Sequence, residues 1–96
     1  MYRDDLFEWD ERKEATNITK HEISFSVAKI AFADPKQIIM RDTLHSDTEE
    51  RFYCIGKVRG QVIMVRFTYR NGKIRIFGAG AWRQARAIYE KKHSLH

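Results

Sequence analysis

Hydrophobic and polar positions follow a strand pattern along most of the second half of the chain. Residues 51–58, 61–69 and 73–78 are rich in β-branched and aromatic types, which favour extended structure. Arg59-Gly60 and Asn71-Gly72 separate these runs, and a two-residue Asn-Gly connection is a strong hairpin signal. The pattern therefore predicts an antiparallel β-meander of three strands.

The first half of the chain follows a helical pattern instead. A short strand is expected at 7–10, where Asp10 can cap a helix over 11–20. A second helix, capped by Ser24 or Ser26, has apolar residues at helical spacing and is ended by Pro35.

Residues 37–40 are expected to form a further strand, 41–50 a polar mobile loop, and 81–92 a last helix. Taken in order, these elements predict an α+β fold. It has two N-terminal helices, an antiparallel β-meander and a C-terminal helix.

The two hairpins also fix which strand residues oppose one another. Tyr53 should face Arg66, Thr68 should face Arg75, and Arg66 should also face Phe77. Opposed residues point to the same side, so one face collects a core set: Phe52, Cys54, Ile63, Val65, Phe67, Tyr69, Ile74 and Ile76. The other face collects Arg51, Tyr53, Arg66, Thr68 and Arg75.

That second face is a candidate phosphate-binding surface. Guanidinium groups match phosphate oxygens and keep their charge, so three arginines on adjacent strands are suited to a polyanion. The alternative is an ordinary solvent-facing sheet, where arginine is common.

Residues 78–83 read Gly-Ala-Gly-Ala-Trp-Arg and lie between the last strand and the last helix. They lack the third glycine of a dinucleotide fingerprint and follow a meander rather than a βαβ unit, so no nucleotide cofactor is expected. We expect a flexible corner that carries Trp82 and Arg83 to the rim of the basic face. The helix N-terminus there can contact phosphate.

Length and composition narrow the class of protein. The 96 residues, 43% of them hydrophobic, suit a single domain over 1–96. No apolar run approaches the ~18 residues of a membrane span, and the acidic N-terminus has no signal pattern, so a cytoplasmic protein without a membrane partner is expected. One cysteine, Cys54, and four histidines without metal-ligand spacing predict no disulfide framework, no metal and no cofactor.

Charge is distributed unevenly along the chain. Residues 1–50 carry 7 Lys and Arg against 12 Asp and Glu, a net charge of −5, whereas residues 51–96 carry 11 against 1, a net charge of +10. A basic half is typical of a protein that binds a polyanion or an acidic partner. The alternative is a solvated surface without a ligand.

No hydrolase motif is present, and Cys54 falls on the predicted core face. The basic face could instead support cleavage of RNA, whose own 2′-hydroxyl is the nucleophile. Such a site needs a base, an acid and a cation, and no metal. His21, Lys20, Tyr53, Tyr69 or a carboxylate could transfer protons, although His21 could equally be a packing residue and Glu49-Glu50 a solvated loop end.

Four segments, in this order and spacing, resemble the BrnT family: FEWDERKEATNITKHEISF at 7–25, AFADP at 31–35, EERF at 49–52 and IRIFGAGAWRQARAIYEK at 74–91. BrnT proteins are the toxins of bacterial BrnT/BrnA type II toxin–antitoxin modules. The resemblance implies a RelE-like sheet and a ribonuclease that inhibits translation. It also implies a cognate BrnA-like antitoxin, through which alone the toxin would contact operator DNA.

The residues that match the motifs of the family are Lys20, His21, Arg51 and Arg75, whereas Arg66 and Tyr53 come from the strand pairing alone. We predict catalytic roles for Arg51, Arg66, Arg75, His21 and Tyr53. We predict RNA contacts from Lys20, Trp82, Arg83 and Arg86. The alternative is a non-catalytic basic module that binds an acidic protein or nucleic acid.

The chain departs from the family pattern at two places. Many members have glycine after Lys-His, whereas this chain has Glu22, so the turn must close differently or the helix must end earlier. Many members have Ser-Ala and basic residues at the corner before the last helix, whereas this chain has Gly78 to Ala81. Either Trp82 and Arg83 replace those charges, or the nuclease activity is weak.

Overall fold

Two antiparallel hairpins form the centre of the sheet in the computed structural model, which describes residues 1–94. The three strands are β4 (Phe52–Val58), β5 (Gln61–Arg70) and β6 (Lys73–Gly80). Both turns have positive φ at both residues: 52° and 81° at Arg59-Gly60, and 53° and 77° at Asn71-Gly72. Because this geometry matches the twist of paired strands, both hairpins form, as predicted.

The pairing of side chains across the meander follows the predicted register, with one exception. Tyr53 lies opposite Arg66, and Thr68 lies opposite Arg75. Arg66, however, pairs with Gly78 rather than with Phe77. Phe77 is an extra residue on β6, which forms a β-bulge and shifts the alternation of the residues after it.

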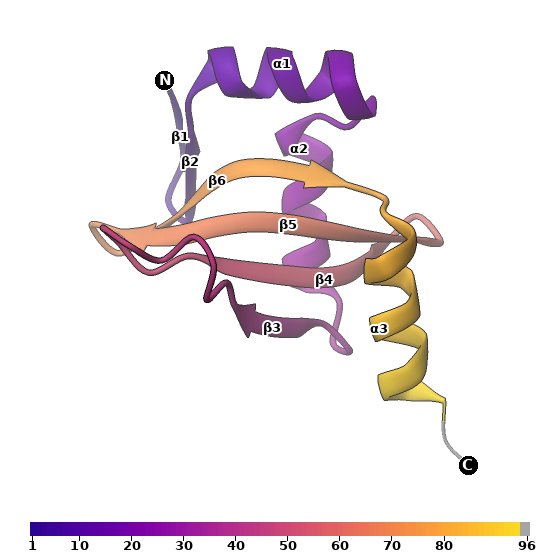
Figure 1. Cartoon of the computed structure of the whole chain (residues 1–96). Helices are drawn as coiled ribbons and strands as arrows, with labels where there is room; N and C mark the ends of the chain where they lie inside the picture. The colour runs from indigo at the N-terminus through magenta and orange to yellow at the C-terminus, as the bar shows by residue number, and fades with distance from the viewer. Residues whose placement is uncertain (95–96) are drawn as a thin grey trace.

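Two N-terminal strands extend the sheet at one edge, and a third strand extends it at the other (Figure 1). β1 (Tyr2–Arg3) pairs with β2 (Phe7–Trp9), which lies parallel to β6, and β3 (Ile38–Arg41) pairs with β4. The order is β1-β2-β6-β5-β4-β3. The sheet is therefore mixed: the predicted meander is antiparallel, whereas the parallel pairing of β2 with β6 was not predicted because these strands are distant in sequence.

The first helix, α1 (Glu11–His21), runs along the outer side of β6 (Figure 1). Asp10 caps it by accepting a hydrogen bond from the Arg12 N–H, as predicted. Glu22 ends the helix in the left-handed conformation, with φ 58° and ψ 30°, and its N–H donates to Ile18 O. The turn thus closes like a glycine cap, with no glycine.

The second predicted helix has two parts, a short α2 (Phe25–Ala28) capped by Ser24 and a 3-10 helix η1 (Lys29–Ala33). These parts and the final helix α3 (Arg83–His93) lie on opposite faces of the sheet (Figure 1). Among the helices of residues 1–94, none has both the length and the apolar character that crossing a bilayer requires.

The main core lies between the sheet and the α2–η1 segment, around the buried residues Trp9, Phe25, Phe67 and Ile76. A smaller cluster packs Ala85 and Tyr89 of α3 on Ile55 and Val62 of the other face. α3 covers only one end of that face.

Two expectations for the sheet need correction. Tyr69 was expected in the core but is 58% exposed, because it lies at the rim, where its ring packs on those of Phe52 and Phe67. The expected corner over residues 78–81 is largely strand, since β6 continues to Gly80 and α3 starts at Arg83. Only Ala81 and Trp82 connect the two elements.

Candidate functional site

A basic groove lies on the part of the sheet face that α3 does not cover. It consists of two adjoining hollows that share Lys13, Arg66 and Phe77. Its α1 end is lined by Arg12, Thr16, Asn17, Lys20 and His21, and its other end by Asp42, His45 and Arg51. Lys20, His21, Arg51 and Arg66 were predicted as site residues, and the fold brings them to one groove.

Arg66, from the middle of β5, lies against the backbone of the neighbouring strand. A Cβ built on Gly78 would sit 3.1 Å from Arg66 Nη2 and 3.4 Å from Nε. The missing side chain at Gly78 therefore lets the guanidinium lie low over β6, in the centre of the groove. In the sequence, Gly78 had been interpreted only as a source of backbone freedom.

The bulge residue Phe77 forms an apolar floor beneath two cations. Arg51 Cζ lies 4.5 Å and Lys13 Nζ 5.1 Å from the centroid of its ring. Cations at these distances are attracted to the face of an aromatic ring. Phe77 thus lies close to one positive charge from α1 and one from the segment before β4, and Arg66 lines the same hollow.

Trp82 folds back over the end of β6 and meets His21. A Cβ on Gly80 would lie 2.5 Å from the Trp82 ring, so only glycine leaves room for the indole there. The rings of Trp82 and His21 meet edge to face, with centroids 5.1 Å apart and planes at 75°. Gly78 and Gly80, which were expected to form a corner, therefore leave space for the side chains of Arg66 and Trp82.

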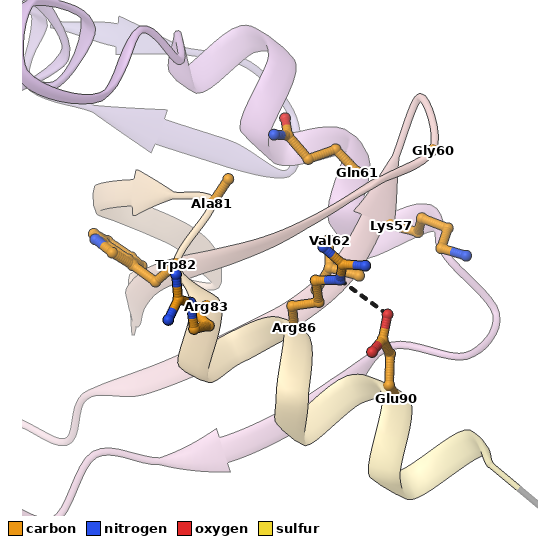
Figure 2. Close-up of a pocket in the computed structure, with 9 residues that line it drawn as sticks. All are labelled: Lys57, Gly60, Gln61, Val62, Ala81, Trp82, Arg83, Arg86 and Glu90. Carbon is orange, nitrogen blue, oxygen red and sulfur yellow. Dashed lines mark hydrogen bonds and ion pairs between the residues drawn. The ribbon is translucent and has the colours of Figure 1, made fainter.

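Arg83 and Arg86 line a separate hollow on α3, with Lys57 and Gln61 (Figure 2). Trp82 also borders this hollow, so it lies between the hollow and the His21 end of the groove. Arg86 Nε is 3.0 Å from Glu90 Oε2 in an exposed ion pair. Of the predicted RNA-binding residues, Lys20 thus lies on the groove side of Trp82, and Arg83 and Arg86 lie on the other side.

Arg75 is not part of the groove. Its Nη1 lies 2.9 Å from Glu8 Oε2, and the two side chains are 12% and 3% exposed. Burial raises the pKa of Glu8, but hydrogen bonding and the charge of Arg75, together with Arg3, lower it overall. Arg75 therefore neutralises a buried carboxylate on β2, a partner that the sequence did not reveal.

Tyr53 lies beside the groove, where its hydroxyl faces the Asp42 carboxylate. Burial raises the pKa of Tyr53, and the hydrogen bond and charge of Asp42 raise it further. The phenol is therefore neutral at physiological pH. Its protonated hydroxyl favours a role in holding Asp42, rather than the proton transfer that was predicted for Tyr53.

Asp42 and His45 were not predicted as site residues, because both fall in the stretch expected to be a mobile loop. His45 Nδ1 is 2.8 Å from Asp42 Oδ2, and their side chains are 56% and 5% exposed. The Asp-x-x-His spacing was visible in the sequence, but nothing local indicated that the loop folds back onto the sheet.

The groove offers cations, two imidazoles and a buried carboxylate, which are the groups that cleavage of RNA requires. Within residues 1–94, His, Cys, Asp and Glu side chains do not gather in groups of three that could bind a metal ion.

The family model described as "Ribonuclease toxin, BrnT, of type II toxin-antitoxin system" matches residues 9–86. Comparison with curated proteins finds no match. The matched range includes every residue that lines the basic groove.

Proposed function

The chain belongs to the BrnT family, the ribonuclease toxins of type II toxin–antitoxin systems, and from this premise we propose that its basic groove cleaves RNA without a metal ion. The observation that carries the proposal is that Lys13, Arg51 and Arg66 line one hollow together with Phe77. A phosphate bound in this hollow would meet cations from α1, from β5 and from the segment before β4.

Cleavage in this groove would use the 2′-hydroxyl of the substrate as the nucleophile. As that oxygen bonds to phosphorus, negative charge builds on the non-bridging oxygens, and Arg51 and Arg66 stabilise it. His21 in its charged form, at the α1 end, donates a proton to the departing 5′-oxygen. The products are a 2′,3′-cyclic phosphate and a 5′-hydroxyl.

The remaining predicted residues have supporting roles in this proposal. Lys20 and Trp82 hold the nucleotide next to the cleaved bond, since an indole offers a stacking surface to any base. Arg83 and Arg86 bind a further phosphate along the strand. Arg75 acts indirectly, by fixing β2 to β6 through Glu8.

In the cell, residues 1–96 would act as one RelE-like toxin domain in the cytoplasm, where cleavage of messenger RNA inhibits translation. The type II family implies an antitoxin partner. We propose that a BrnA-like antitoxin neutralises the chain by covering the basic groove, and that operator DNA is bound through the antitoxin.

The direct test is cleavage of an RNA oligonucleotide by the purified chain in EDTA, with product ends identified by mass spectrometry. Arg66→Ala and Arg51→Ala should each reduce the rate by about 10²-fold or more, because each removes a donor to the developing charge. Arg59→Ala is the matched control, since it removes one positive charge from an exposed turn outside the groove. Full activity in Arg66→Ala would refute the assignment.

The separate hollow at Arg83 and Arg86 supports a second candidate, a non-catalytic module that binds nucleic acid or an acidic protein. This candidate predicts no cleavage but binding that weakens steeply with salt, by about 0.7 in log K per phosphate for each tenfold rise in salt on single strands. Titration of a labelled oligonucleotide at several salt concentrations separates the two.

A further inference from the structure

We propose that His45 is the general base of the basic groove and that Asp42 positions it. This inference rests on the proposed ribonuclease function, which leaves the group that takes the 2′-hydroxyl proton unassigned. It starts from the loop between β3 and β4, which is folded back onto the sheet and places an imidazole beside Arg51 and Arg66.

Hydrogen bonds close this loop upon itself. The Asp42 N–H donates to Arg51 O at 2.7 Å, and the Ser46 hydroxyl donates to Asp42 O at 2.6 Å. The Arg51 N–H donates in turn to Ser46 Oγ at 3.0 Å. Residues 42–51 therefore form a clamped turn that presents His45 at a defined place, which a scaffold for catalysis requires.

Asp42 fixes the tautomer of His45. The carboxylate is buried and accepts from the Leu44 N–H at 3.2 Å as well as from the His45 ring. Burial raises the pKa of Asp42, but its hydrogen bonds with His45, Tyr53 and the Leu44 N–H lower it overall. An ionised carboxylate can only accept, so Nδ1 carries the proton and Nε2 keeps a free lone pair.

The charged groups around His45 come from every element at this end of the groove. Asp42 is hydrogen-bonded to the imidazole, and Lys13, Arg51 and Arg66 line the same hollow. Tyr53, on β4, is neutral and faces Asp42.

In the proposed step, His45 Nε2 takes the proton of the 2′-hydroxyl as O2′ bonds to phosphorus and the bond from phosphorus to O5′ breaks. O5′ receives its proton from charged His21 at the opposite end of the groove. One proton is thus gained by His45 and one is lost by His21, and the phosphate passes over the cations between them. No oxidant, reductant or metal takes part.

The test is the dependence of kcat/KM on pH for an RNA oligonucleotide, in the wild type and in His45→Gln and His45→Ala. The wild type should give a bell-shaped profile. Both variants should lose about 10²- to 10⁴-fold at the optimum, the usual contribution of a general base. Their acidic limb should disappear, and added imidazole should restore part of the activity of His45→Ala only.

Two controls separate chemistry from folding. His93→Gln changes a histidine of α3 outside the groove and should keep the wild-type profile. Binding of an oligonucleotide with 2′-deoxyribose at the cleaved position, together with the melting temperature, should be unchanged in His45→Gln. Asp42→Asn should shift the acidic limb, because the amide no longer fixes the Nδ1–H tautomer.

The outcomes distinguish this inference from the function on which it rests. If the wild type cleaves RNA and His45→Gln retains its rate or its acidic limb, His45 is not the base and the ribonuclease proposal stands. Loss of activity with both limbs intact and no imidazole rescue would assign His45 a structural role and also overturn the inference. A wild type that cleaves no RNA would overturn both.

Discussion

At the scale of single residues, the absence of side chains at two glycines of β6 determines where larger side chains lie. Gly78 and Gly80 occupy the end of β6, and side chains from elsewhere fill the space that they leave. Arg66 lies over the first and the Trp82 ring over the second. Neither Gly78 nor Gly80 has a positive φ. The backbone conformation therefore does not require glycine at either position.

Replacing either glycine should therefore act on its neighbour rather than on the backbone. Gly78→Ala should lower the cleavage rate by about tenfold by raising the Arg66 guanidinium, since sub-ångström displacement of a catalytic group is costly. Gly80→Ala should weaken RNA binding and change the fluorescence of Trp82. Both effects are measured by single-turnover kinetics and by fluorescence titration.

Double-mutant cycles provide the controls. Gly78→Ala should have no further effect on the rate in an Arg66→Ala background, and Gly80→Ala none on binding in a Trp82→Ala background. If a glycine substitution still lowered the rate or the binding in the background that lacks the neighbouring side chain, the close approach would not be the reason for the glycine.

At the scale of elements, the groove depends on how α1 is attached to the sheet. β2 pairs only with the first half of β6, and the Asn17 side chain takes over beyond it. Asn17 accepts from the Ala79 N–H at 3.0 Å and donates to Ala79 O and to Ile23 O, both at 2.9 Å. A buried amide thus completes the hydrogen bonding of the strand and fixes the helix that carries Lys13 and His21.

Asn17→Ala should lower the free energy of unfolding by about 3 kcal/mol, because it leaves buried backbone groups of Ala79 and Ile23 without partners. Urea denaturation followed by circular dichroism measures this loss. Thr16→Ala, at an exposed position of the same helix, should change stability by less than ~0.5 kcal/mol. A similar effect of both substitutions would mean that the amide bridge contributes little.

Elements built from local signals were predictable from the sequence. Asn71-Gly72 specified a hairpin and its register, while Asp10 and Ser24 marked the starts of helices. The Glu8–Arg75 pair was not predictable, since it joins a parallel strand pair distant in sequence. The Phe77 bulge and the Asp42–His45 pair depend on backbone details that alternation of residue types does not encode.

At the scale of the whole molecule, the acidic first half and the basic second half meet in specific ion pairs. Arg75 of β6 pairs with Glu8, and Arg70 Nη2 of β5 lies 2.9 Å from Glu49 Oε1. These ion pairs neutralise part of the positive charge of the second half. Within residues 1–94, Arg66 of the groove and Arg83, Lys91 and Lys92 of α3 form no ion pair, so both places retain positive charge.

Carboxyl groups whose pKa is lowered in the folded chain make stability depend on pH. Five carboxyl groups have a pKa below the ordinary values of 3.8 for Asp and 4.5 for Glu: those of Asp4, Glu8, Asp10, Asp34 and Asp42. At acidic pH the unfolded chain therefore binds more protons than the folded chain. The free energy of unfolding should be at its full value above about pH 4.5 and should fall as the pH decreases below it.

Glu8→Gln tests the contribution of one buried carboxyl group. At pH 7 it should cost about 3 kcal/mol, because Arg75 loses the partner of a buried ion pair. It should also flatten the decline of stability below pH 4.5, since one shifted carboxyl is gone. Denaturation curves between pH 7 and pH 3 provide both values, and Asp5→Asn, at an exposed turn residue, is the control.

The attachment of α1 and β2 to β6 also has a consequence during protein synthesis. Asn17 of α1 is made early, whereas its partner Ala79 on β6 follows 62 residues later. A nascent chain cannot assemble the groove until β6 is available to pair. The order of the elements therefore delays assembly of the groove until β6 has been made.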